Sequence, residues 1–190
     1  MYQRSHFLLS PENSMLLMID FQERLMPTIE NAQAIVFRAR QLLETAKTFG
    51  ICIVVSEQYP QGLGSTVPEL RSVLPTEVPI FAKKSFSVCG DESLYNEIEK
   101  YPASKIVLCG VETHICVQQT ALDLLAMGRE VVLVSDASGS RFSNNNEIAL
   151  RRMESAGIIL STTESVMFEW CATAENPYFK TISRLAKELI

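Results

Sequence analysis

Six short apolar runs alternate with helical patterns along this chain, and the alternation limits the folds open to it. The runs occupy residues 15–19, 51–55, 78–82, 106–109, 131–134 and 158–160. Each is too short for a buried helix, and continuous apolar runs of this length are typical of strands buried on both faces. Strands that alternate with helices form parallel sheets with right-handed crossovers. We therefore expect a three-layer, Rossmann-like α/β fold: a six-stranded parallel sheet of order 3-2-1-4-5-6, with helices on both faces.

The helical patterns carry start and stop signals that predict where the helices lie. Thr28, Asn144 and Asn176 are the side chains expected to cap the first turns of three helices. Gly50 and Gly157 are expected to end the first two of these helices, because glycine tolerates the left-handed conformation common at helix ends.

Length and composition favour a single domain over residues 1–190. The 190 residues are 47% hydrophobic, enough for a substantial core. The net charge of −5 comes without any basic block, so we expect no nucleic-acid partner. No apolar run approaches the 18 residues of a membrane span, so we expect no membrane contact either. Five scattered cysteines and the lack of a signal-peptide pattern favour an intracellular protein, in the cytoplasm or in an organelle such as the mitochondrion.

The stretch from residue 104 to 125 contains the strongest candidate for a nucleophile. A buried strand ends at Gly110, and a helical pattern begins a few residues later, which puts Cys116 in or near the first helical turn. Free amide groups and the positive end of the helix dipole favour a thiolate at such a position. The alternative is that Cys116 is a small buried hydrophobe, as we expect of Cys52 and Cys109 inside strand patterns. Cys89 and Cys171 are expected to be structural.

Two more groups follow strand ends that the predicted topology brings to the same crevice. Asp20 directly follows the first strand, and Lys83 and Lys84 follow the third. In the order 3-2-1-4-5-6, these ends meet the strand that leads to Cys116 at the topological switch point. Asp20 as a helix cap and the lysines as a solvated surface are the simpler alternatives. By accident, however, a carboxylate, an ammonium and a thiol converge on one crevice far more rarely than any one of them occurs there alone.

The chain resembles the isochorismatase-like hydrolase (cysteine hydrolase) superfamily, in particular its isochorismatase domain-containing branch, whose members mostly lack an assigned substrate. The resemblance covers nearly the whole chain. It is carried by the motifs MLLMIDFQE, SEQYPQGLGSTVPEL, KKSFS, GVETHICVQQTALDLL, SDASGSR and TESVMFEW.

The resemblance implies a catalytic triad of Asp20, Lys83 and Cys116. Lys83 is chosen over Lys84 because the family's lysine precedes a serine by four positions, here Ser87, and because neighbouring strand residues point to opposite faces.

It also implies a cis peptide between Val111 and Glu112. Backbone amides of Glu112 or Thr113, together with that of Cys116, would form an oxyanion hole within the turn that includes Val111.

Four polar residues are expected to bind substrate or shape its pocket: Gln22, Glu57, Gln58 and Tyr59. His114 is expected to support the site or an interface rather than to act as its base.

A metal or cofactor is not expected. Metal-dependent nicotinamidases of this superfamily carry an aspartate and paired histidines after the second strand, where this chain has Ser56-Glu57-Gln58-Tyr59. The first strand is also not followed by a glycine-rich nucleotide-binding turn.

The expected activity is hydrolysis of a small-molecule amide, carbamoyl or ester bond. The alternatives are vinyl-ether hydrolysis of an isochorismate-like substrate with Asp20 as acid, and a non-catalytic binding or scaffold role. A homo-oligomer, dimer or tetramer, is expected because the C-terminal third looks rich in exposed aromatic and apolar residues, namely Met167, Phe168, Trp170, Tyr178 and Phe179.

Overall fold

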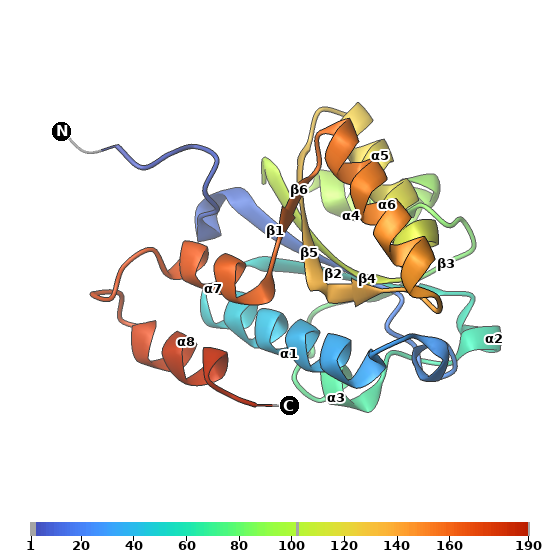
Figure 1. Ribbon diagram of the computed structural model, residues 1–190, viewed down its shortest axis with the longest axis horizontal. Coiled ribbons are helices and arrows are strands. Elements are labelled where there is room, and N and C mark those ends of the chain that lie inside the picture. Colours follow the sequence, from blue (N-terminus) through green and yellow to red (C-terminus); the bar gives the residue numbers. More distant parts are fainter. Residues whose placement is uncertain (1–2, 102, 190) are drawn as a thin grey trace.

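The computed structural model describes residues 3–101 and 103–189, and these form a three-layer α/β structure around one parallel sheet (Figure 1). The sheet has the order β3-β2-β1-β4-β5-β6, and every strand pair in it is parallel, as predicted. Its strands are β1 (Ser14–Ile19), β2 (Cys52–Gln58), β3 (Ile80–Lys83), β4 (Lys105–Val111), β5 (Glu130–Gly139) and β6 (Ile159–Ser161).

Eight α-helices and four other helical segments accompany the strands within the described residues. The α-helices are α1 (Ala32–Thr48), α2 (Pro60–Leu63), α3 (Pro68–Arg71), α4 (Glu92–Glu99), α5 (Gln118–Ala126), α6 (Ser143–Ala156), α7 (Thr163–Cys171) and α8 (Phe179–Ala186). The other segments are the 3-10 turns η1 (Pro11–Asn13), η2 (Met26–Thr28) and η3 (Val88–Gly90), and the π-helical turn η4 (Thr113–Val117), which runs directly into α5. Within the described residues, no helix is both long and apolar enough to cross a bilayer.

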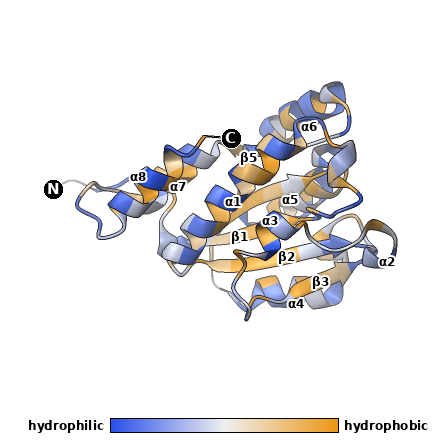
Figure 2. Ribbon diagram, turned by 90° about the horizontal axis from the view of Figure 1, so that it is seen from below, coloured by the Kyte–Doolittle hydropathy of each residue, from blue (hydrophilic) through white to orange (hydrophobic). Residues whose placement is uncertain are grey.

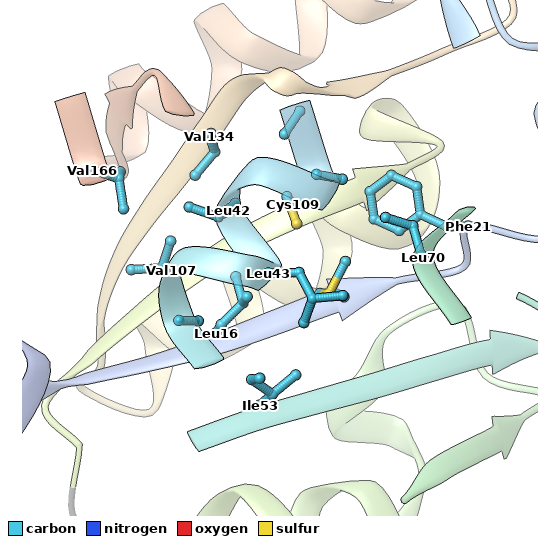
Figure 3. Packing of buried hydrophobic residues seen from close by; sticks show 14 of the residues in the cluster. Leu16, Phe21, Leu42, Leu43, Ile53, Leu70, Val107, Cys109, Val134 and Val166 are labelled. Carbon is cyan, nitrogen blue, oxygen red and sulfur yellow. The ribbon is translucent and has the colours of Figure 1, made fainter. Parts of the chain in front are cut away.

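Alternate residues of the central strands build two separate cores, one on each face of the sheet. On β1, Leu16 and Met18 face the core beneath α1, α3 and α7. Figure 3 shows that core, with Leu42 and Leu43 of α1 packed over the sheet. The next residues along β1, such as Leu17, face the opposite core beneath α4, α5 and α6. The central strands are therefore hydrophobic over much of their length (Figure 2), which explains why their sequences form continuous apolar runs.

Three predicted helix caps are displaced, and for two of them a local turn takes up the capping side chain. The Thr28 hydroxyl donates to the carbonyl of Leu25 within η2, so α1 begins only at Ala32. Helix α6 begins one residue before Asn144, and no side chain caps it. Asn176 accepts from the amide of Tyr178 in a turn that precedes α8.

The predicted helix stops agree better with the structure. Gly157 adopts the left-handed conformation directly after α6, and Gly50 does so two residues after the end of α1. A glycine in this conformation carries no side-chain clash, so the chain can turn sharply into the next strand.

The C-terminal third is less exposed than its sequence suggests. Met167 and Trp170 lie in the interior, and the indole of Trp170 donates a hydrogen bond to the Ser14 hydroxyl at the start of β1, 3.0 Å away. Of the five residues on which the expectation rested, only Phe168 and Tyr178 are exposed, and Phe179 is half-buried. The expectation that Met167 and Trp170 are exposed is therefore wrong, since α7 packs its apolar side against α1 and the sheet.

Candidate active site

Asp20 lies at the end of β1 with its carboxylate enclosed in the protein. The residue has no exposed surface, and its backbone is in the left-handed region, with φ 57°. Its amide donates to the carbonyl of Ser56 on β2, and the Ser56 hydroxyl donates to Asp20 Oδ1 at 2.7 Å. Asp20 is therefore held from the neighbouring strand, by a residue to which the sequence analysis gave no role. The signal that could have found Ser56 is its position, since it follows the apolar run of its own strand as Asp20 does.

Lys83, the last residue of β3, completes a buried ion pair with Asp20. The Lys83 ammonium lies 2.8 Å from Asp20 Oδ2, and neither side chain has exposed surface. The ammonium also donates to Gln58 Oε1 at 2.7 Å and to the carbonyl of Phe86 at 3.1 Å. Its neighbour Lys84 is exposed, as strand alternation predicts. It is therefore Lys83, and not Lys84, that the fold brings to Asp20.

Cys116 lies in η4, at the start of the helical segment that continues as α5, and only 6% of its surface is exposed. Both Asp20 and Lys83 are near enough to act on the thiol through charge and hydrogen bonding. Burial, and next the charge of Asp20, raise the pKa of Cys116 to about 12, whereas Lys83 lowers it.

This shift is opposite in direction to the one expected from the position of Cys116 at the start of a helix. Loss of solvent and a neighbouring carboxylate outweigh the cation and the helix terminus. At neutral pH the thiol is protonated, so its proton must leave before or during any attack.

The other four cysteines offer no activated thiol. Burial raises the pKa of Cys89 to about 11 and raises those of Cys52, Cys109 and Cys171 as well. Cys109 lies in the core beneath α1, on the face of the sheet opposite to Cys116. Only Cys116 combines a thiol with a nearby carboxylate and ammonium.

The turn between β4 and η4 presents backbone amides beside Cys116. The Val111–Glu112 peptide bond is cis, and Thr113 is the first helical residue after it. The first amides of a helix lack partners within the helix, and the side chain of Glu112 does not cap them. The Thr113 hydroxyl is also buried without a hydrogen-bond partner among the described residues. Donors at this turn are in the region where an oxyanion hole was predicted.

Of the four predicted substrate-binding residues, two are committed to bonds within the protein. Gln22 has no exposed surface. Its side-chain nitrogen Nε2 donates to the backbone carbonyls of Gln58 and Gly64, and its side-chain oxygen Oε1 accepts from the backbone amide of Gln58. Glu57 accepts from both the amide and the hydroxyl of Thr66. These residues hold the loop after β2 against β1, and a direct contact of either with substrate stays a prediction.

Gln58 and Tyr59 lie closer to open space. Gln58 binds Lys83 through one end of its side chain and the Lys84 carbonyl through the other. Tyr59 is half-exposed and lines a hollow of about 350 Å³ together with Lys83, Ser85 and Asp91. This hollow adjoins the outer side of β3, and neither Asp20 nor Cys116 is among its lining residues. The substrate roles of both residues stay predictions.

Both ring nitrogens of His114 have partners other than the thiol. Its Nδ1 lies 2.9 Å from the Ser140 hydroxyl, and its Nε2 lies 3.4 Å from the side-chain amide nitrogen of Asn145. An amide nitrogen can only donate, so Nε2 is the acceptor and Nδ1 carries the proton. This geometry fits a supporting residue better than a base for Cys116. Among the described residues, no group of three or more His, Cys, Asp or Glu side chains could hold a metal ion.

Comparisons with known proteins agree with this fold. The sequence model of the isochorismatase domain matches residues 14–165. Isochorismatase domain-containing protein 1 of Danio rerio is 43% identical over 180 residues, which cover 94% of this chain and 62% of that protein. Isochorismatase domain-containing protein 2 of Rattus norvegicus is 38% identical over 179 residues, covering 94% of this chain and 83% of that protein. The chain thus spans about three fifths of the length of the Danio rerio relative.

Two solved structures are similar along nearly the whole chain. One is described as the MAR1 ribonuclease from Caenorhabditis elegans, with a TM-score of 0.89 and 36% identity, covering 94% of this chain and 91% of that one. The other is the YcaC gene product from Escherichia coli, described as an octameric hydrolase of unknown specificity, with a TM-score of 0.90. It covers 96% of this chain and 91% of its own, and at 24% identity it shows the shared fold alone.

Proposed function

Because this chain belongs to the isochorismatase family, we propose that it is a hydrolase that cleaves a small amide, carbamoyl or ester substrate through a covalent intermediate on Cys116. The observation that carries the proposal is the buried Asp20–Lys83 ion pair beside a thiol at the start of a helix. An ion pair without exposed surface is costly to bury, and a site that moves protons is a reason to retain it.

The first step couples attack to proton transfer. The Cys116 thiol is protonated at rest, so its proton passes to the Asp20 carboxylate as the sulfur bonds to the substrate carbonyl carbon. Lys83 then stands beside a neutral Asp20, and its positive charge favours the negative charge that develops on the substrate. Ser56 holds the carboxylate in place during this transfer through its bond to Oδ1.

The second half of the cycle returns the proton. The carbonyl oxygen becomes an oxyanion, and amides of the Glu112–Cys116 turn donate hydrogen bonds to it. When the intermediate collapses, the carbon–nitrogen or carbon–oxygen bond breaks and Asp20 gives its proton to the leaving group. Water then attacks the thioester with Asp20 as base, which releases the acid and restores the thiol.

A screen of small amides, carbamoyl compounds and esters tests this proposal. Wild type, Cys116→Ala and Cys89→Ala are compared, with and without a strong chelator. We expect hydrolysis that Cys116→Ala abolishes, that Cys89→Ala retains and that the chelator leaves unchanged. Equal turnover in wild type and Cys116→Ala would contradict the covalent route.

The raised pKa of Cys116 favours one second candidate, in which Asp20 acts alone. A protonated thiol is a poor nucleophile, whereas Asp20 could protonate the vinyl ether of an isochorismate-like substrate. The same variants separate the two mechanisms. Under this alternative, isochorismate turnover persists in Cys116→Ala and is lost in Asp20→Asn. If every compound is inert with the wild type, a binding or scaffold role takes precedence.

RNA is the weaker substrate, although the Caenorhabditis elegans structure is described as a ribonuclease. The net charge of −5 opposes the binding of a polyanion. An RNA oligonucleotide belongs in the same screen, and its Cys116-independent cleavage would replace the amide proposal.

We also propose that residues 1–190 form one domain and that this domain assembles with copies of itself. The Escherichia coli YcaC neighbour is described as octameric, and this chain exposes large apolar side chains at and near the start of α6, such as Phe142 just before the helix and Ile148 on it.

A further inference from the structure

The end of β5 and the loop after it contact the end of β4 and the turn after it at three alternate residues. At the first of them, the amide of Gly110 donates to the Ser138 hydroxyl, 3.3 Å away, and that hydroxyl donates onward to the carbonyl of Val134. The other two contacted residues are Glu112 and His114. Their partners, like Ser138, belong to the motif SDASGSR, to which the proposed reaction gives no role.

The Glu112 contact is the strongest of the three. Its side chain is only 6% exposed, and Oε2 accepts from the backbone amide of Arg141 at 3.0 Å. The Arg141 Nε lies 3.1 Å from each carboxylate oxygen, so it donates between them. A buried carboxylate needs such a cation, because an unpaired one would be strongly destabilising. Glu112 is also the residue just before the helical turn that presents Cys116.

The third contact lies two residues closer to the thiol. His114 binds the buried Ser140 hydroxyl through Nδ1, and Ser140 is fixed in turn because its carbonyl accepts from the amide of Glu30. The segment that contains the predicted oxyanion donors and leads to Cys116 is therefore held at Glu112 and His114 by Ser140 and Arg141 of the loop after β5.

We propose that Arg141, together with Ser140, positions the turn that presents Cys116 and thereby keeps the thiol buried. This inference rests on the proposed function of Cys116. Arg141 acts through Glu112 and touches no reacting atom, so it is a positioning residue. Its charge holds Glu112, Glu112 fixes the start of η4, and the fixed turn excludes water from the thiol. Loss of the contacts that Arg141 and Ser140 make with this turn would admit water, lower the pKa of Cys116 and misplace the oxyanion donors.

The test uses iodoacetamide, with labelling of each cysteine followed by mass spectrometry from pH 7 to 10. In Arg141→Met, we expect Cys116 to label about tenfold faster than in wild type at pH 8, since each unit of fall in pKa gives about tenfold more thiolate. Cys109 and Cys171 should keep their wild-type rates. The matched control is Arg152→Met, which removes an exposed arginine from α6 and should change no rate more than twofold.

A double-mutant cycle shows whether Arg141 acts through Glu112. The single variant Glu112→Gln should already speed labelling of Cys116, and adding Arg141→Met should add little to it. If Arg141→Met does not fold, Arg141→Lys and Ser140→Ala provide the comparison, because each removes only part of these contacts. With an amide found in the screen, Arg141→Met should lower kcat about tenfold with KM within twofold.

Three results would overturn the positioning role: an unchanged rate at Cys116, an equal rise at all five cysteines, or additive effects in the cycle. A raised KM with normal labelling would make Arg141 a substrate-binding residue instead and overturn it as well. The labelling experiment needs no turnover, so a negative result there does not bear on the proposed hydrolase activity. That activity is tested separately, by comparing the turnover of wild type and Cys116→Ala.

Discussion

At the scale of single residues, Asp20 has opposite effects on Cys116 at rest and in reaction. At rest, its negative charge helps to raise the pKa of the thiol to about 12. In the proposed reaction, the same carboxylate receives the proton that the thiol must lose. A group that suppresses the thiolate in the empty site can therefore still be required for attack.

Asp20→Asn separates these two effects. The substitution removes the negative neighbour, so the pKa of Cys116 should fall and iodoacetamide should label it severalfold faster at pH 8. Turnover should fall by about 10²- to 10⁴-fold, because the acceptor of the proton is gone. Slower labelling of Cys116 in this variant, measured by mass spectrometry, would show that Asp20 does not act on the thiol.

Lys83 matters for stability as well as for reactivity. Lys83→Met leaves the Asp20 carboxylate buried without its cation, which should lower the free energy of unfolding by about 3–5 kcal/mol. Urea unfolding measures this loss. Lys84→Met is the control on the exposed neighbour, with an expected change within about 0.5 kcal/mol. Adding Asp20→Asn to Lys83→Met should recover part of the loss, and a double variant no more stable than the single would contradict the pairing.

At the scale of elements, the end of β4 must pass very close to the end of β1. Gly110 adopts φ 147°, and a Cβ there would overlap the carbonyl oxygen of Ile19. This close approach places the turn that leads to Cys116 directly beside Asp20, so the site depends on how two neighbouring strands end.

Gly110→Ala should therefore cost about 3 kcal/mol or more in the free energy of unfolding, because backbone strain and a backbone clash add. The control is Gly128→Ala, which also has a positive φ but nothing within 4 Å of the added carbon, and it should cost about 1–2 kcal/mol. Equal losses in urea unfolding would mean that the clash with Ile19 is relieved by movement.

Helix α4 gives a prediction with a pH dependence. The Asp91 carboxylate accepts from the hydroxyl of Ser93 and from the amides of Ser93 and Leu94 at the helix start, and these bonds lower the pKa of Asp91. A lowered carboxyl pKa stabilises the fold above the ordinary pKa of about 3.9, and this contribution disappears as the pH falls through the lowered value.

Asp91→Ala should thus cost about 1 kcal/mol at pH 7 in urea unfolding, and the difference from wild type should shrink in acid. The difference between Asp91→Asn, which caps without charge, and Asp91→Ala should not depend on pH, because neither side chain titrates. A constant difference between wild type and Asp91→Ala at every pH would exclude the charged cap.

At the scale of the whole molecule, two separate cores on the faces of one sheet leave the carboxyl ends of the strands as the place for chemistry. The candidate site lies on that edge. Its thiol is almost fully buried, so access to it depends on the loops around the edge or on a neighbouring subunit.

Light scattering at micromolar concentration tests the proposed assembly. We expect a mass that is a multiple of 21.3 kDa, a dimer or larger, because apolar side chains at and near the start of α6 are exposed in the monomer. Phe142→Ser with Ile148→Ser should reduce that mass if α6 lies in the interface, whereas Glu154→Ser on the same helix should not. A wild-type mass of 21.3 kDa would contradict assembly.

The sequence by itself determined the order of elements, the sheet and the residues that meet at its edge. Buried parallel strands read as apolar runs, and a polar residue just after such a run, like Asp20, must lie at the carboxyl edge. The period of two along a strand distinguished Lys83 from Lys84. These are local signals, which is why one sequence was enough to read them.

Only the tertiary structure decided the state of the thiol and the contacts that hold its turn. The pKa of Cys116 depends on how much solvent the packing removes and on how close Asp20 lies, and neither is written in residues near position 116. The Glu112–Arg141 pair joins residues that are 29 positions apart in the sequence. Trp170 forms its hydrogen bond with Ser14, which is 156 positions away. Burial and long-range pairing arise from the packing of distant elements, so a local pattern cannot give them.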